Sequence, residues 1–183
     1  MKSSIYRNTE YASNKWERPF STKHPLHITM HSTLAVGERS LRVPTTLEFI
    51  EGRIRYLAKH FQVKLFHFAI ESNHLHLVVM APEKKNLSGF MSSLAGIIAR
   101  NVLKAEKGHG KKIKFWSERP YSRVLSWGRE LRNVIHYVQR NVLEARRSIQ
   151  YTPRSQHLGA KAKFQIEKSL KEISPQLSFP LVS

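Results

Sequence analysis

A β-hairpin signal in the middle of the chain constrains the fold more than any other feature. Residues 63–70 are almost continuously apolar, and a second β-rich stretch, 74–80, follows after the short turn Ser72-Asn73. So short a connection joins antiparallel neighbours, because parallel strands need a long crossover. The sequence therefore predicts an antiparallel sheet that contains this hairpin. A strand that is apolar on both faces is typical of a sheet interior, so 63–70 is predicted as a central strand.

Strand and helix patterns alternate on either side of the hairpin. Apolar residues alternate in 25–31 and within 115–127, as in strands, and recur at helical spacing in 46–60, 87–105 and 131–145. The resulting order is strand, helix, strand, strand, helix, strand, with a last helix appended. We therefore expect an α+β fold, a ferredoxin-like split βαβ sandwich whose antiparallel sheet carries helices on one face and the appended helix separately.

Local signals mark the expected ends of the helices. Thr45 and Glu48 have the spacing of a capping box before the first helix, and Asn86 is the expected N-cap of the second. Gly108-His109-Gly110 is expected to stop the second helix, because glycine is a poor helix former.

Length and charge restrict the organisation and the partner. A chain of 183 residues is long enough for one domain with a core and too short for two comfortable ones. Lys and Arg number 31 against 13 Asp and Glu, so the net charge is +18, far beyond what solubility requires. A polyanion is the expected partner. We expect a basic and aromatic arm at 1–24, the domain at 25–147 and a basic tail at 148–183.

The expected cellular location of the protein is inferred from features that the sequence lacks. It contains no run of about 18 apolar residues, so nucleic acid is favoured over a membrane. It has no cysteine, which excludes disulfides and thiolate metal sites and fits a reducing compartment. The first residues have no apolar stretch like that of a secretory signal, and a cytoplasmic location is expected.

Two histidines lie on an otherwise buried strand. Side chains alternate along a strand, so His74 and His76 share one face while Leu75, Leu77 and Val79 share the other. Such a pair can hold one divalent cation on a rigid backbone. A lone His-x-His is more often a hydrogen-bonded or solvated pair, and a third ligand would have to come from elsewhere.

The last predicted helix brings a second pair of polar residues. At 100° per residue, Tyr137 and Asn141 fall one turn apart on a flank of its apolar stripe, whereas His136, Arg140 and Arg147 point away. Taken singly, Tyr137 can equally be a rim tyrosine packed against the sheet, and Asn141 an exposed helix residue.

Together these motifs resemble the single-tyrosine HUH transposases, in particular their REP-associated tyrosine transposase branch. The family's motif of His, a hydrophobic residue and His is similar to 74–76, which Asn73 precedes. Its helix motif of Tyr, a hydrophobic residue, two variable residues and Asn is similar to 137–141, with a small residue at Ala145. Residues 115–121 resemble the family's Trp-containing strand. The resemblance covers roughly 26–145.

The resemblance implies a metal-dependent enzyme that nicks and rejoins single-stranded DNA at hairpins or repeat-associated ends. Tyr137 is then the catalytic nucleophile, which forms a 5′-phosphotyrosine and leaves a 3′-OH. His74, His76 and Asn141 are the implied ligands of a divalent cation, Mg²⁺ or Mn²⁺. Because the covalent link keeps the energy of the cleaved bond, rejoining needs no ATP.

Basic side chains are expected to bind the DNA phosphates. The expected partner is single-stranded or hairpin DNA, with no membrane, and a monomer is preferred to a homodimer. The residues expected to contact DNA are Arg100, Lys104, Lys111, Lys112, Lys114, Arg119, Arg123 and Arg140.

Alternatives from other functional classes stay open. One is a non-catalytic nucleic-acid-binding domain of ferredoxin-like fold, although no stretch resembles the aromatic strand motif of RNA-recognition domains. Another is a metal phosphoesterase that uses water, against which the missing carboxylates argue. Within the enzyme hypothesis, Tyr121 and Tyr151 are alternative candidates for the nucleophile. Further histidines that could lie near the cation are His27, His31 and His67.

Overall fold

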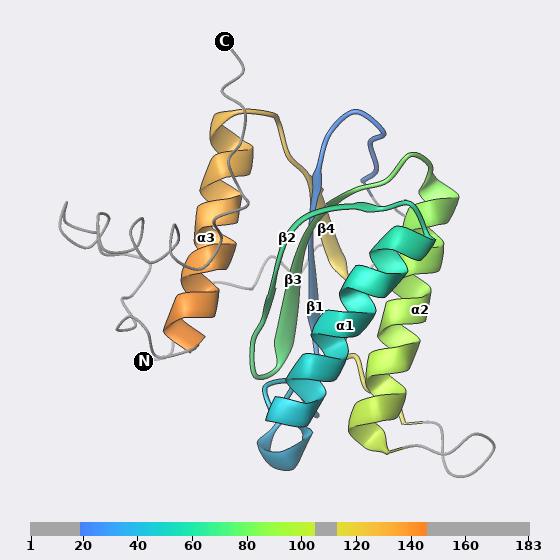
Figure 1. Cartoon of the computed structure of the whole chain (residues 1–183), viewed down its shortest axis with the longest axis vertical. Coiled ribbons are helices and arrows are strands. Elements are labelled where there is room, and N and C mark those ends of the chain that lie inside the picture. Colours follow the sequence, from blue (N-terminus) through green and yellow to red (C-terminus); the bar gives the residue numbers. More distant parts are fainter. Residues whose placement is uncertain (1–18, 105–112, 146–183) are drawn as a thin grey trace, which may run out of the picture.

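The computed structural model describes residues 19–104 and 113–145, which form an antiparallel sheet with helices on both faces (Figure 1). The sheet is four-stranded, in the order β2-β3-β1-β4. In chain order the elements are β1 (Leu26–His31), the 3₁₀ turn η2 (Gly37–Arg39), α1 (Pro44–His60), β2 (Lys64–Ile70), β3 (His74–Met80), α2 (Lys84–Leu103), β4 (Tyr121–Val124) and α3 (Arg129–Ala145).

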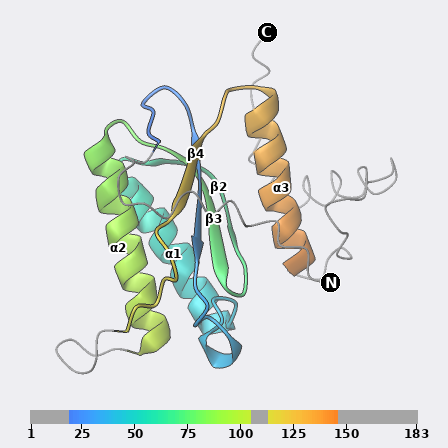
Figure 2. The same ribbon diagram turned by 180° about the vertical axis from the view of Figure 1, so that it is seen from behind.

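The helices lie in two separate layers. Helices α1 and α2 cover one face of the sheet and α3 stands on the other, as Figure 1 and the reverse view in Figure 2 both show. The predicted α+β architecture is confirmed, including the hairpin of β2 and β3 and the appended last helix. We call the side of the sheet that α3 occupies the α3-side face.

The main core lies between the sheet and helices α1 and α2. Leu75, Leu77 and Val79 of β3 are fully buried there, as the alternation predicted, and they pack with Ile54 of α1 and Phe90 of α2 in one apolar cluster. Burying a side chain of this size contributes about 1.5–3 kcal/mol. This cluster therefore makes β1 and β3 a rigid support for whatever the opposite face carries.

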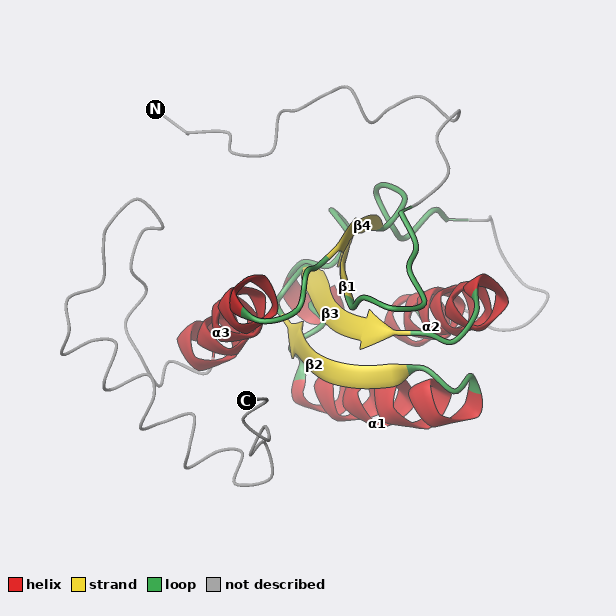
Figure 3. Cartoon of the chain, turned by 90° about the horizontal axis from the view of Figure 1, so that it is seen from above, coloured by secondary structure: helices red, strands yellow, loops and turns green. Residues whose placement is uncertain are grey.

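A smaller core attaches α3. Val78 of β3 and Ala69 of β2 pack with Leu131, Val134 and Val138 of the helix. Figure 3 shows β2 and β4 at opposite edges of the sheet, and α3 packs mainly against β2. The β2 and β3 half of the α3-side face is thus the half that the helix covers.

The prediction that residues 63–70 form a central strand is wrong. β2 lies at the edge of the sheet and pairs with β3 alone among the described strands. It is mostly apolar because helices cover both of its faces, α1 on one side and α3 on the other. Burial from above and below produces the same apolar pattern as a position between two strands.

Both predicted N-caps are wrong. α1 starts at Pro44, with Val43 as N-cap and no side-chain cap, because proline suits the first turn, where its missing N–H costs nothing. α2 starts at Lys84 after Glu83, and the Asn86 amide instead donates to the Phe61 carbonyl at 3.0 Å.

The expected end of the second helix also differs. α2 ends at Leu103, because Lys104 adopts the left-handed conformation with φ 49°. Gly108 and Gly110 lie outside the described residues.

The two expected flanking segments fall largely outside the described residues, apart from 19–24 of the arm. Within the described part of the chain, no helix combines the length and the apolar character needed to cross a membrane.

Candidate active site

The α3-side face of β1 and β3 carries a cluster of polar rings. Because Ile28 and Met30 of β1 are buried against α1 and α2, the alternating residues His27, Thr29 and His31 point to the opposite face. The register pairs Thr29 with His76 and His31 with His74. Four histidines from two adjacent strands therefore share the face on which α3 stands.

His74 is held through Asn73, the residue before it. His74 Nδ1 lies 2.9 Å from Asn73 Oδ1, and the amide nitrogen of Asn73 lies 3.3 Å from His31 Nε2. The amide oxygen only accepts, so His74 Nδ1–H is the donor. His74 Nε2 is then the nitrogen whose lone pair a cation can use.

His76 is held in the same way by β1. It is 2 % exposed, and its Nδ1 lies 3.2 Å from both His27 Nε2 and Thr29 Oγ1. The rings of His27 and His76 stack, with centroids 5.3 Å apart. Burial, and second the charge of Arg123, lower the pKa of His27 from 6.5 to about 4. His27 is therefore neutral at pH 7 and places no positive charge beside His76.

Tyr137 of α3 meets this cluster directly. Its ring stands edge-on to the His76 ring with centroids 5.7 Å apart, and the His76 and His74 rings are 4.9 Å apart. Asn141, one helical turn further along α3, is 4 % exposed rather than a solvated helix residue. The structure thus brings three of the four predicted site residues into one cluster and buries the fourth on the same helix.

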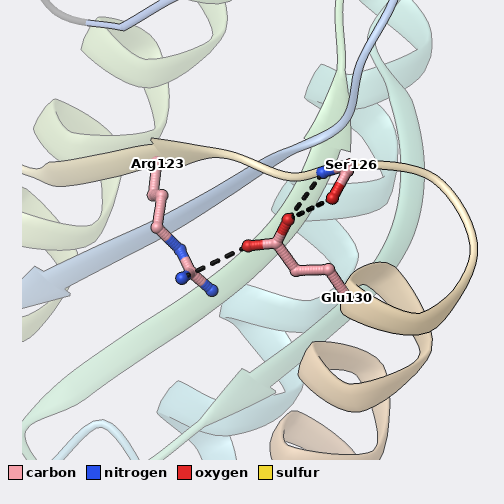
Figure 4. Close-up of polar contacts among 3 residues, drawn as sticks. All are labelled: Arg123, Ser126 and Glu130. Atoms are coloured by element: carbon pink, nitrogen blue, oxygen red, sulfur yellow. Dashed lines mark hydrogen bonds and ion pairs between the residues drawn. The ribbon is translucent and has the colours of Figure 1, made fainter.

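A clamp at the start of α3 sets where the helix stands. Glu130 Oε2 accepts from the backbone N–H of Ser126 at 2.8 Å and from its hydroxyl at 2.5 Å, and Glu130 Oε1 pairs with Arg123 of β4 at 3.3 Å (Figure 4). The hydrogen bonds from Ser126, and then the charge of Arg123, lower the pKa of the Glu130 carboxyl. We call Arg123, Ser126 and Glu130 the α3 clamp.

The predicted DNA-contacting residues have different surroundings. Arg123 belongs to the α3 clamp, and Arg140 forms an ion pair with Glu144 at 2.7 Å with its side chain only 12 % exposed. The others within the described residues are exposed, and they are Arg100, Lys104, Lys114 and Arg119. Lys111 and Lys112 lie outside the described residues.

Sequence reasoning missed part of the cluster. Thr29 was not singled out, and His27 was considered only as a rival ligand, whereas both hold His76. The α3 clamp was not predicted either. The available signal was the alternation of His27, Thr29 and His31 with apolar residues, which places these three side chains on one face of a strand. Which strand lies beside them depends on non-local pairing, which the alternation does not show.

The donor set fits a divalent cation that keeps part of its water shell. Among the described residues, no group of three or more His, Cys, Asp or Glu side chains is arranged to hold a metal. Two imidazoles and one amide are a short ligand set, so a cation held there would take its remaining ligands from water or from a substrate phosphate.

Comparison with known proteins identifies the family. Residues 26–141 match the family described as "Transposase IS200 like", which is more than half of the chain. The chain therefore belongs to the IS200-like transposases, enzymes that cut and rejoin DNA. A comparison with curated proteins found no match.

Two solved structures are similar. One is a REP-associated tyrosine transposase bound to a REP hairpin, with 11 % identity and a TM-score of 0.52, covering 72 % of this chain and 74 % of the other. At this identity the likeness shows the fold. The second is a protein from Deinococcus radiodurans R1 described as a candidate transposase, with 18 % identity and a TM-score of 0.43, covering 69 % of this chain and 97 % of the other.

Proposed function

We propose that this transposase is a metal-dependent enzyme that nicks and rejoins single-stranded DNA at hairpin ends, with Tyr137 as its nucleophile. The observation that carries the proposal is the contact of the Tyr137 ring with His76, at 5.7 Å between centroids. Tyr137 and His76 come from elements far apart in the chain. A purely structural tyrosine at the rim of the sheet could pack on any apolar residue, whereas this one lies against a histidine of the proposed metal site.

The chemistry assigned to Tyr137 is a transesterification. The Tyr137 oxygen attacks the phosphorus, the bond from phosphorus to the 3′ oxygen breaks, and that oxygen leaves as a 3′-OH after taking up a proton. The phenol must give up its own proton as it attacks, and water takes up that proton. A 3′-OH that attacks the phosphotyrosine reverses the step and rejoins the strand.

His74, His76 and Asn141 are the residues that would hold the cation. When bound, a divalent cation supplies positive charge for the non-bridging phosphate oxygens. Asn73 fixes the tautomer of His74, and His27 with Thr29 holds the His76 ring at its Nδ1, so the Nε2 atom of each histidine would be the one to bind the cation.

The proposed substrate is single-stranded DNA next to a hairpin. The net charge of +18 and the exposed basic residues support binding to a polyanion. The description of the similar solved structure names a REP hairpin as its ligand, and DNA of this kind is the first to test.

A labelled-oligonucleotide assay tests the proposal. Hairpins with single-stranded flanks are incubated with the protein in Mn²⁺, and a DNA adduct that survives denaturation is expected. Tyr137→Phe should abolish the adduct while DNA binding persists, and Tyr56→Phe, on the exposed side of α1, is the matched control.

Other outcomes would favour other assignments. A nick without an adduct would support the water-using phosphoesterase, and tight binding without a nick would support the binding module. Loss of the adduct in Tyr121→Phe, with Tyr137→Phe still active, would reassign the nucleophile.

A further inference from the structure

The other half of the α3-side face carries a second aromatic residue. β4 pairs with β1 in a register that puts Tyr121 beside Thr29 and Arg123 beside His27. Directly paired residues point to the same side of a sheet, so Tyr121 lies on the face that carries His76 and Tyr137. Unlike Tyr137, it is on the edge strand away from β2, against which α3 packs.

The register also gives its distance from the histidine pair. Thr29 is paired with Tyr121 on one side and with His76 on the other. Tyr121 and His76 therefore occupy one row across the sheet, two strands apart, which is about 10 Å between their backbones. A DNA strand that runs from a phosphate bound at His76 toward β4 passes over this row.

The surroundings of Tyr121 suit a nucleic-acid strand. Its side chain is 49 % exposed although it is large and aromatic. Arg119 before it is exposed, and the side chain of Arg123 after it is 47 % exposed. An aromatic ring set between basic side chains is the arrangement with which proteins stack unpaired bases while binding the adjoining phosphates.

We infer that Tyr121 is a stacking platform for the base of a nucleotide next to the phosphate that Tyr137 cleaves. This inference rests on the proposed function for the position of that phosphate. The ligand is a single-stranded DNA base of any identity, because stacking uses the face of the base and not its hydrogen-bonding edge. Tyr121 is thus a binding residue, and it holds the strand in line with the nucleophile.

Binding to two matched oligomers tests this role. The full-length chain carrying Tyr137→Phe, which prevents cleavage, is titrated with a fluorescent single-stranded oligothymidine and with an abasic oligomer of the same length. Adding Tyr121→Ala should weaken binding to oligothymidine about 5- to 100-fold. It should change binding to the abasic oligomer less than about twofold, since the phosphate contacts remain. Tyr121→Trp should restore the affinity for oligothymidine.

The chain offers a matched control. Tyr56 of α1 is also exposed, at 60 %, and has basic neighbours in Arg55 and Lys59, but it lies on the opposite side of the sheet. Tyr56→Ala should leave both affinities unchanged. Tyr121→Leu is a second test variant, because leucine keeps most of the side-chain volume but has no aromatic face. Thermal melting of both Tyr121 variants checks that they are folded.

The two proposals fail in different ways. If Tyr121→Ala and Tyr121→Leu bind oligothymidine as Tyr56→Ala does, the platform is wrong, whatever the adduct assay shows. An equal loss on oligothymidine and on the abasic oligomer also overturns it, because stacking requires a base. If the chain with Tyr137 intact forms no adduct while Tyr121→Ala still loses affinity for oligothymidine alone, the nucleophile assignment fails and the platform stands.

Discussion

At the residue scale, the site depends on side chains that hold other side chains. His76 is buried and is fixed at Nδ1 by His27 and Thr29, while His74 is fixed at Nδ1 by Asn73. A histidine that binds a metal through one nitrogen is usually oriented by a partner at the other. The strand pair β1 and β3, with Asn73 just before β3, thus supplies both proposed histidine ligands and the residues that orient them.

Loss of this support should weaken the response to the cation. His27→Ala should raise the Mn²⁺ concentration needed for half-maximal adduct formation about 10- to 100-fold, because His76 loses one of the partners that fix its ring. His27→Gln, whose amide oxygen can accept, should recover part of the loss. The matched control is His60→Ala, at an exposed position of α1. An unchanged Mn²⁺ titration in His27→Ala would contradict the role.

His67 gives a pH-dependent prediction. Burial, and second the charge of Arg55, lower its pKa from 6.5 to about 4, and its buried Nε2 has no hydrogen-bond partner among the described residues. Between these two pH values the unfolded chain binds a proton that the folded chain does not, so the free energy of unfolding falls as pH decreases from 6.5 to 4. In His67→Phe the free energy of unfolding should decrease less steeply between pH 6.5 and pH 4. Urea denaturation at a series of pH values across this range measures the difference. Identical slopes would show that His67 does not contribute.

At the scale of elements, α3 is the part whose placement decides function. It carries Tyr137 and Asn141, and it is attached by the small apolar core and by the α3 clamp. Its apolar stripe was predictable from the spacing of its residues, but its position opposite β3 was not, because a stripe shows that a helix packs without showing against what.

Removing the clamp should impair activity more than folding. Glu130→Ala deletes the acceptor for Ser126 and the partner of Arg123, so Tyr137 loses its fixed position over His76. Adduct formation should slow about tenfold or more, since small misplacements of a nucleophile are costly. Glu130→Gln still accepts a hydrogen bond from Ser126 but loses the ion pair with Arg123. Its rate of adduct formation should therefore lie between those of the unchanged protein and Glu130→Ala. Glu48→Ala, an exposed glutamate of α1, is the control, and equal rates in both alanine variants would exclude the clamp from catalysis.

At the scale of the whole molecule, the charge of +18 dominates how the chain meets DNA. Single-stranded DNA affinity should fall linearly with salt on logarithmic axes, with a slope of about 0.7 per neutralised phosphate. Lys114→Ala and Arg119→Ala should each lower that slope by about this amount and reduce affinity for all sequences alike. Lys59→Ala, on the outer side of α1, should leave the slope unchanged. Slopes that are equal in every variant would place the bound strand elsewhere.

The sequence by itself determined the order of helices and strands, the hairpin and the shared face of His74 and His76, because each depends on residues close together in the chain. Tertiary structure alone decided that β2 lies at an edge, that His27 and Thr29 meet His76, and that Tyr137 stands over that ring. These contacts join residues dozens of positions apart. Side-chain periodicity repeats every few residues and therefore says which face a residue occupies, whereas strand order and helix docking say what that face meets.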